Sequence, residues 1–309
     1  MAYRYDARMS VDVAVVGSCN LDLVIWVDHV PLAGETVLGG DLVQIPGGKG
    51  ANQAVAAARL GRSVAMIGRV GDDAAAEVLR SALEADGVDT TRLLATPGVP
   101  SGVALIAVQG DGDNAIVVSP GANGRVTADD VEGSDAVRTA VVVLAQAEVP
   151  LEAVVEAARL AEGIVVWNPA PAPAEGVPLE LLESVDVLVP NQTELGLLVG
   201  YDGNVDRDIA VELARRLPCA AVVVTLGSDG ALVVSGPDVV HVPAPVVTPV
   251  DTTAAGDSFC GALADRLVGG DDLVTAARWA VQVGAATTLV AGAQPSLPTP
   301  ADVAARLGL

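Results

Sequence analysis

Hydrophobic residues fall into two alternating kinds of segment along most of the chain. Short continuous apolar runs, as at residues 11–17 and 140–144, predict strands that are buried on both faces of a sheet. Longer segments with helical apolar spacing, as at 151–161 and 271–291, predict the helices that cover such a sheet. Further strand-like runs lie at 63–71, 164–167, 185–189 and 221–225, and further helix-like segments at 53–60, 72–86 and 300–307. This order predicts a doubly wound, mostly parallel α/β sheet flanked by helices.

Two segments of the first half, residues 21–46 and 101–120, depart from this rhythm. Apolar and polar residues alternate there around turn residues such as those at 109–113, which is typical of β-hairpins. We expect the two segments to form a small β-sheet lid that can close over a site and whose exposed face can serve as a dimer interface. Because no linker or internal repeat interrupts the chain, we predict a single domain over 11–309, with residues 1–10 as a flexible tail.

Polar residues follow most of the predicted strands. Asn20 and Asp22 come after the first strand, and Glu148, Asn168 and the segments 191–194 and 225–230 come after later strands. In an open α/β sheet these ends lie at one edge, where ligands bind, so together they predict a cleft. Each residue taken alone has a structural alternative, such as an Asx turn at Asn20.

The turn at residues 251–257 has the composition of a catalytic loop. Ala254, Ala255 and Gly256 carry almost no side chain, so the N–H groups at the start of the following helix can approach an anion closely. Asp257 could accept a proton from a hydroxyl group whose target phosphate rests on those N–H groups. The turn therefore indicates phosphoryl transfer to an alcohol, unless Asp257 only caps the helix.

A glycine cluster at residues 46–52 contains the only lysine of the chain, Lys49. Its spacing matches neither the Walker motif nor the dinucleotide fingerprint. Lys49 and Asn52 lie three residues apart at the start of a predicted helix, so they can face the same pocket. Glu194 is a candidate for ordering Mg²⁺ and its waters around phosphates, although it could equally be a helix-start glutamate.

The net charge of −22 argues against nucleic acid or an anionic membrane as a partner. An anionic nucleotide must then be held locally by backbone N–H groups, helix N-termini and a metal ion. The three cysteines lack metal-ligand spacing, and no apolar run reaches the ~18 residues of a membrane helix. The N-terminus also lacks the pattern of a signal peptide, so we expect a cytoplasmic protein.

A series of short motifs follows in the order typical of one enzyme family. The motifs are GSCNLD at 17–22, GGKGANQ at 47–53, GAN at 121–123, NPAPA at 168–172, PNQTE at 190–194, TLGS at 225–228 and DTTAAGD at 251–257. From about residue 11 to its end the chain therefore resembles the PfkB-type carbohydrate kinases, and within them the branch that phosphorylates ribose. The resemblance implies ATP-dependent phosphorylation of a primary hydroxyl of a sugar, under a β-sheet lid that commonly forms a homodimer.

The resemblance also implies roles for individual positions. Asp257 is expected to deprotonate the 5-hydroxyl of D-ribose, with an anion hole formed by Ala254, Ala255, Gly256 and Asp257 itself. The expected sugar-binding residues are Asn20, Asp22, Gly48, Lys49, Gly50, Asn52, Glu148 and Asp257. The expected ATP-binding residues are Asn191, Thr225, Gly227, Ser228, Gly230 and Gly256. Glu194 is expected to act on Mg²⁺ indirectly, and the positions expected to hold K⁺ are Asp251, Thr253, Thr287, Val290, Gly292 and Ser296.

Some positions depart from the family pattern, and some alternatives stay open. Gln192 stands where glutamate is common, Val281 and Gln282 lie where the family often places Asn or His beside adenine, and Cys260 replaces a commoner asparagine. The acceptor could be another pentose or a nucleoside, depending on lid residues such as Trp26 and Ile106, although Trp26 could instead pack in a dimer contact. A non-catalytic sugar-binding protein is disfavoured, because binding alone would not require both Asp257 and Glu194.

Overall fold

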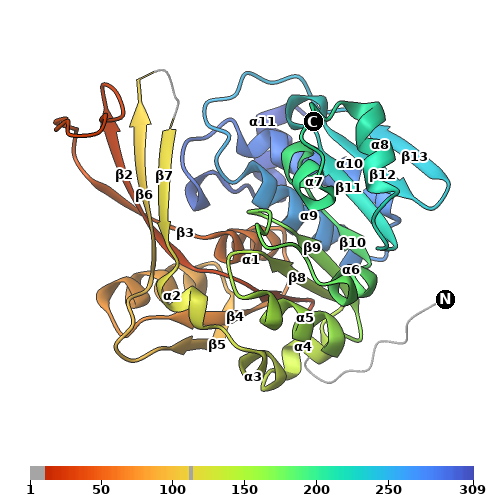
Figure 1. Ribbon diagram of the computed structural model, residues 1–309, viewed down its shortest axis with the longest axis horizontal. Helices are drawn as coiled ribbons and strands as arrows, with labels where there is room; N and C mark the ends of the chain where they lie inside the picture. The colour runs from red at the N-terminus through yellow and green to blue at the C-terminus, as the bar shows by residue number, and fades with distance from the viewer. Residues whose placement is uncertain (1–10, 111–113) are drawn as a thin grey trace.

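The structure is a computed structural model that describes residues 11–110 and 114–309. The predicted tail at 1–10 and the middle of the predicted turn at 109–113 lie outside the described residues. Within the described part, a nine-stranded sheet flanked by helices lies beside a separate four-stranded sheet (Figure 1). This confirms the predicted fold class.

The large sheet is parallel through its centre and antiparallel at one edge. Its strands run in the order β13-β12-β11-β10-β9-β8-β1-β4-β5. The parallel strands are β1 (Val13–Val16), β4 (Val64–Val70), β5 (Asp89–Ala95), β8 (Val142–Gln146), β9 (Ile164–Asn168), β10 (Val187–Leu188) and β11 (Ala221–Thr225). Two antiparallel strands, β12 (Ala231–Ser235) and β13 (Asp238–Val242), complete it.

The hydrophobic pattern did not predict β5, β12 or β13. The strand β5 forms one edge of the sheet, where polar residues such as Asp89 and Arg92 interrupt the apolar run that marks a central strand. The strands β12 and β13 pair antiparallel, so no helical crossover precedes them. The pattern used to predict strands was a continuous apolar run followed by a helix. The missed strands lie where this pattern is absent.

Helices cover both faces of the large sheet. Val13 and Val15 of β1 pack in one core with α1 (Lys49–Arg59), α9 (Ala255–Val268) and α10 (Leu273–Thr287). Ala14 and Val16 face the opposite core with α5 (Leu151–Leu160). The remaining helices of four or more residues are α2 (Ala74–Ala85), α3 (Ala128–Glu132), α4 (Asp135–Thr139), α6 (Leu179–Ser184), α7 (Gln192–Val199), α8 (Arg207–Ala214), α11 (Pro300–Leu307) and the 3-10 helix Gly121–Arg125. No helix of the described part is long and apolar enough to cross a membrane.

The small sheet stands out from one end of the molecule, with α1 near its base (Figure 1). Its order is β3 (Val43–Gly47), β2 (Asn20–Val27), β6 (Gly102–Gln109) and β7 (Asn114–Ser119). The predicted pairs β2/β3 and β6/β7 are antiparallel, and a parallel pairing of β2 with β6 joins them into one sheet. Residues 28–42 form a long irregular connection, so the first pair is not a tight hairpin.

Candidate active site

The parallel strands bring the predicted polar positions to one edge of the large sheet. Because β1, β8, β9, β10 and β11 all run in the same direction, their carboxyl ends lie side by side. Asn20, Glu148, Asn168, Asn191 and Thr225 lie at or just beyond these ends. The predicted convergence at one edge is confirmed.

Glycines let the start of α1 approach this edge closely. Gly48 has a φ of 90°, and a Cβ atom there would lie 2.6 Å from the backbone nitrogen of Asn20. A Cβ atom on Gly50 would lie 2.5 Å from the backbone nitrogen of Ser18. At both positions there is no space for a larger residue. At Gly48 the positive φ also disfavours any residue other than glycine. The glycine cluster therefore places the first turn of α1, with Lys49, against the end of β1.

Asp257 is the centre of the arrangement. It lies in the first turn of α9 and is 7 % exposed. Its Oδ2 accepts a hydrogen bond from Asn52 Nδ2 at 2.9 Å, and its Oδ1 accepts one from Gln53 Nε2 at 3.2 Å. Ala254 is the N-cap of α9, and the helix start has no side-chain cap. Asp257 is therefore not a helix cap, and its carboxylate is held by donors from another helix.

The backbone around Asp257 is shaped for a small-residue turn. Ala254 adopts a φ of 58°, the left-handed conformation that costs a residue with a Cβ atom about 1 kcal/mol. A Cβ atom on Gly256 would meet no other atom within 4 Å. Protein packing therefore does not require glycine at 256, and the space next to the helix start is open.

The residues expected to bind the sugar are fixed by hydrogen bonds that leave their other polar atoms available. Ser18 Oγ donates to Glu148 Oε2 at 2.5 Å, and the N–H of Lys49 donates to the same oxygen at 3.1 Å. Asn123, from the GAN motif, donates to Asn20 Oδ1 at 2.7 Å and also bonds both backbone groups of Cys19. The Oδ1 atom of Asn52 is buried without a partner among the described residues.

The charges in this region are crowded. Burial, followed by the carboxylates of Glu148 and Asp257, raises the pKa of Asp22 to about 7. Burial alone would lower the pKa of Lys49, but the surrounding carboxylates, Asp257 first, outweigh it and raise the pKa. Lys49 is therefore held as a cation among acidic groups. A negatively charged ligand would bind next to this cation.

The predicted nucleotide-side residues form two turns at neighbouring strand ends. Asn191 caps α7 in a reciprocal pair with Glu194, whose Oε2 accepts from the Asn191 N–H at 2.8 Å. Glu194 therefore does stabilise the start of α7, the structural alternative considered for it. Its Oε1 has no donor in the described part of the chain. Burial raises the pKa of Glu194, against the opposing effects of Asn191 and Lys49. Gly230, with a φ of 94°, is required because a Cβ atom there would lie 2.0 Å from the Val242 carbonyl oxygen.

The positions proposed for a monovalent cation gather only in part. Asp251 accepts hydrogen bonds from the N–H groups of Thr253 and Gly292, both at 2.8 Å. Burial would raise the pKa of Asp251, but these two hydrogen-bond partners outweigh it and lower the pKa. The hydroxyl of Thr287 donates within the protein, and the Ser296 carbonyl accepts from Arg306 Nη1 at 2.7 Å. The Thr287 hydroxyl is thus committed within the protein, so a cation held here would depend on Asp251 and backbone oxygens more than on hydroxyl groups.

Among residues 11–110 and 114–309, no cluster of three or more His, Cys, Asp or Glu side chains could hold a metal ion. Hard cations such as Mg²⁺ are often bound by one or two carboxylates together with substrate phosphates. Glu194, with one carboxylate oxygen uncommitted, fits that limited role.

The departures from the family pattern have different structural settings. Gln192 donates through Nε2 to the Val205 carbonyl and so ties α7 to the following loop. Val281 is buried and Gln282 half-buried on α10. Cys260 is fully buried, and burial raises its pKa well above the usual range. Nothing in the structure explains why cysteine occupies that position.

A buried amide network under Asp257 was not predicted from the sequence. Gln53, Gln146 and Asn168 are linked by hydrogen bonds at the carboxyl ends of β8 and β9. Gln53 and Asn168 belong to motifs, but the sequence carried no signal that Gln53 contacts both Asn168 and Asp257. The single sign available in the sequence was Gln53 itself, a polar residue inside the Ala-rich apolar face of α1, which indicates a buried hydrogen-bond partner.

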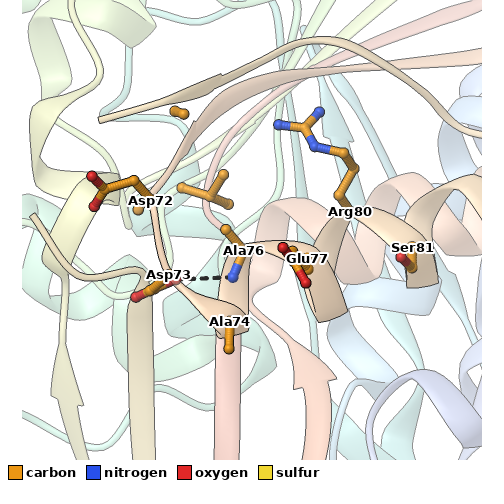
Figure 2. A pocket seen from close by; sticks show the side chains of 10 residues that line it. Asp72, Asp73, Ala74, Ala76, Glu77, Arg80 and Ser81 are labelled. Atoms are coloured by element: carbon orange, nitrogen blue, oxygen red, sulfur yellow. Dashed lines mark hydrogen bonds between the residues drawn. The ribbon is translucent and has the colours of Figure 1, made fainter. Parts of the chain in front are cut away.

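A separate hollow of about 700 Å³ lies beside the start of α2 (Figure 2). Asp73 there caps α2 through the N–H of Ala76 at 2.9 Å, and Arg80 donates to the carbonyls of Thr90 and Leu93. Its main polar groups serve the fold, and it contains none of the predicted site residues.

The chain is similar to known sugar kinases over nearly its whole length. The model of the family described as pfkB family carbohydrate kinase matches residues 11–300. The chain is 38 % identical to a ribokinase of Bacillus subtilis over 94 % of this chain and 98 % of that protein. It is 37 % identical to a deoxyribokinase of Salmonella typhi over 94 % and 96 % of the two chains. The structure of an Arabidopsis thaliana ribokinase complexed with ribose and ATP superposes with a TM-score of 0.87, at 31 % identity, over 97 % of this chain and 100 % of that chain.

Proposed function

The chain belongs to the pfkB family of carbohydrate kinases, and we propose that it transfers the γ-phosphoryl group of ATP to the 5-hydroxyl of D-ribose. The products are ribose 5-phosphate and ADP. One observation carries the proposal: Asp257, held by two amide donors, lies between sugar-side polar residues and an open helix start of small residues. The similarity to ribokinases and to a ribokinase complexed with ribose and ATP supports this acceptor.

In the proposed reaction, Asp257 accepts the proton of the ribose 5-hydroxyl as that oxygen attacks the γ-phosphorus. The bond between the new oxygen and phosphorus forms while the bond to the β,γ-bridging oxygen breaks, and ADP leaves. The N–H groups of the α9 start, at Ala254 to Asp257, stabilise the negative charge on the transferred group. The open space beside Gly256 supports this placement.

Ribose recognition is proposed for polar atoms that the protein leaves uncommitted. Among the described residues, Asn52 Oδ1 has no partner and Asp22 accepts no hydrogen bond, so both can accept from sugar hydroxyls. The remaining proposed sugar ligands are Asn20, Gly48, Lys49, Gly50 and Glu148. A closed site with this many directional groups favours a substrate with many hydroxyl groups.

ATP is proposed to bind across Asn191, Thr225, Gly227, Ser228, Gly230 and Gly256. Mg²⁺ would be ordered through water by Glu194 and would neutralise charge on the phosphates. K⁺ is proposed at Asp251, Thr253, Thr287, Val290, Gly292 and Ser296, mainly through backbone oxygens. Lys49, held as a cation near Asp257, supports binding of the anionic groups.

We propose that the chain is one domain from 11 to 309 and that the small sheet acts as its lid. Trp26, Leu105, Ile116 and Val117 of this sheet are each about half exposed or more, at 49 %, 53 %, 53 % and 65 %. Such exposed apolar side chains support a homodimer formed through the lid. The free cysteines support a reducing compartment such as the cytoplasm, and the charge of −22 supports no nucleic-acid or membrane partner.

A second candidate is phosphorylation of another pentose or of a nucleoside by the same chemistry. The similarity to a deoxyribokinase supports 2-deoxyribose as the first alternative acceptor. A nucleoside would have to place its base against the lid, where Trp26 is half exposed. A sugar-binding protein without activity has less support, because the proposed base is already ordered by Asn52 and Gln53.

The test is an assay of ADP release with ATP and Mg²⁺, in which ribose, deoxyribose, fructose and adenosine are compared with and without K⁺. We expect the highest kcat/KM with ribose and an increase with K⁺. A preference for deoxyribose or adenosine would move the assignment to the second candidate. No turnover with any acceptor would contradict the kinase activity.

A further inference from the structure

Gln53 is a polar side chain buried where α1 packs against α9. It is 0 % exposed and is one of the largest fully buried side chains of the described residues. The two helices are close here, since a Cβ atom on Gly261 of α9 would lie 3.0 Å from the Gln53 carbonyl oxygen. An amide buried this completely needs partners for its polar atoms, because an unmade hydrogen bond in the interior is costly.

All the partners of Gln53 are polar side chains at the sheet edge or on α9. Its Oε1 accepts from Gln146 Nε2 at 2.7 Å, and its Nε2 donates to Asn168 Oδ1 at 3.1 Å and to Asp257 Oδ1 at 3.2 Å. Asn168 Nδ2 in turn donates to the Val189 carbonyl at 2.8 Å.

These hydrogen bonds fix the orientation of the side-chain amides of Gln146, Gln53 and Asn168. A backbone carbonyl can only accept, so Asn168 must turn its nitrogen toward Val189 and its oxygen toward Gln53. Gln53 must then present its nitrogen to both Asn168 and Asp257. Asp257 Oδ1 therefore always faces a donor N–H of Gln53.

The two donors of Asp257 differ in their surroundings. Asn52 binds Oδ2 and keeps its own Oδ1 free for a ligand, so it serves both the base and the proposed sugar. Gln53 makes all its contacts inside the protein. Its effect on the reaction can therefore act only through Asp257.

We propose that Gln53, oriented by Gln146 and Asn168, is a positioning residue that keeps a donor on Asp257 Oδ1 and so aims its carboxylate at the acceptor hydroxyl. This inference rests on the proposed function, because it assigns the support of the proposed base. It predicts that removal of the Gln53 donor impairs turnover and proton acceptance, with little effect on sugar binding.

The test is the pH profile of kcat at saturating ribose and ATP for Gln53→Met, which has a similar size but no donor. We expect kcat to fall about 10- to 100-fold and its acidic limb to move up by about 1 pH unit, because the ionised base loses a donor. The KM for ribose is expected to change by less than about 3-fold, since Asn52 remains. A merely structural role would not move the acidic limb.

Other ionisable groups around Asp257 stay unchanged in this comparison. They are Asp22 on β2, Lys49 on α1, Glu148 after β8, Glu194 on α7 and Cys260 on α9. A matched control is Thr90→Val on the edge strand β5, which removes another buried donor, bonded to Glu84 at 2.6 Å. We expect Thr90→Val to lose stability without a shift of the limb.

The inference is overturned if the limb of Gln53→Met superposes on that of the wild type, or if Thr90→Val moves it equally. If Gln53→Met does not fold, Gln53→Glu replaces it with a side chain of the same size. Two adjacent carboxyl groups would then share a proton, so the limb should move upward, and an unmoved limb would again overturn the inference. Asp257→Asn distinguishes failure of the proposed base from failure of the proposed role of Gln53. Retained turnover in Asp257→Asn contradicts the base role of Asp257. Lost turnover in Asp257→Asn, together with an unmoved acidic limb in Gln53→Met, contradicts only the role of Gln53.

Discussion

Asp257 and Asp22 are buried to almost the same extent, with exposures of 7 % and 8 %, yet their surroundings are opposite. Asp257, in the helical floor of the site, receives hydrogen bonds from Asn52 and Gln53. Asp22, on strand β2 of the small sheet, receives none from the described residues, and burial raises its pKa to about 7. One carboxylate is prepared by the protein, and the other lacks the partners that a ligand could supply.

This contrast separates two tasks that carboxylates perform in a kinase. A base must be ionised and aimed before the substrate arrives, because reorganisation during the reaction would raise the barrier. A ligand for hydroxyl groups can remain unsatisfied until binding, when the sugar supplies the missing donors. We therefore propose that the floor is the catalytic region and the base of the small sheet the recognition region, and the following predictions test that division.

The largest effect is expected from Asp257→Asn. Turnover should fall about 10²- to 10⁴-fold, the usual contribution of a general base, because the amide cannot accept the hydroxyl proton. The Kd for ribose, measured by isothermal titration calorimetry, should change far less than kcat. Equal losses in kcat and ribose affinity would place Asp257 in recognition and remove the contrast with Asp22.

Asp22→Asn should have the reverse profile. The loss of a charged acceptor is expected to weaken ribose binding about 10- to 100-fold at pH 8, where Asp22 is mostly ionised, with a smaller effect on kcat. Asp28→Asn makes the same charge change on an exposed residue just after β2 and should leave the Kd unchanged. A drop in kcat with an unchanged Kd would contradict the recognition role.

Asp22 should also make the stability of the ligand-free protein depend on pH. Its pKa is raised from 3.8 to about 7 on folding, so between these values the folded state binds its proton more tightly than the unfolded state. The stability that this proton contributes is complete below about pH 4 and is lost as the pH rises through 7. Relative to Asp22→Asn, the wild-type free energy of unfolding should therefore fall by on the order of 3 kcal/mol from pH 4 to pH 8. Urea unfolding of both proteins across this range measures the difference, and parallel curves would show that Asp22 is not strained.

The two regions also differ in how far the sequence predicted them. The motifs and strand ends placed Asp257, Asn52, Asp22 and Glu148 at one edge, because parallel strands carry their carboxyl ends together. The contact of Gln53 with Asp257 was not predictable in the same way, since the two residues are 204 residues apart and meet only through tertiary packing. A local pattern can thus indicate a catalytic residue without revealing what orients it.

The fold shows the same limit. Central strands such as β1 and β8 are continuous apolar runs and were predicted, whereas the edge strands β5 and β13 carry polar residues and were not. The strand β12 is apolar at 231–234 but was also missed, because a short turn and not a helix separates it from β11. The parallel pairing of β2 with β6 was also not predicted, although both hairpins were. Pairing between hairpins depends on contacts across the whole sheet, which no single segment encodes.

The smallest effect is expected from the backbone under the prepared base. Ala254 adopts a left-handed conformation with a φ of 58°, and Ala255 begins the helix in α9. Ala254→Gly should raise the free energy of unfolding by about 0.5 kcal/mol, because glycine adopts this conformation without strain while losing more entropy on folding. Ala255→Gly is the matched control and should lower it by about 0.5 to 1 kcal/mol, since it has the same chemical change at a helical position. Opposite signs in urea unfolding would show that the floor stores backbone strain beside the proposed catalytic carboxylate, as strained residues at functional sites do. Equal signs would show that the preparation of Asp257 lies in its hydrogen bonds alone.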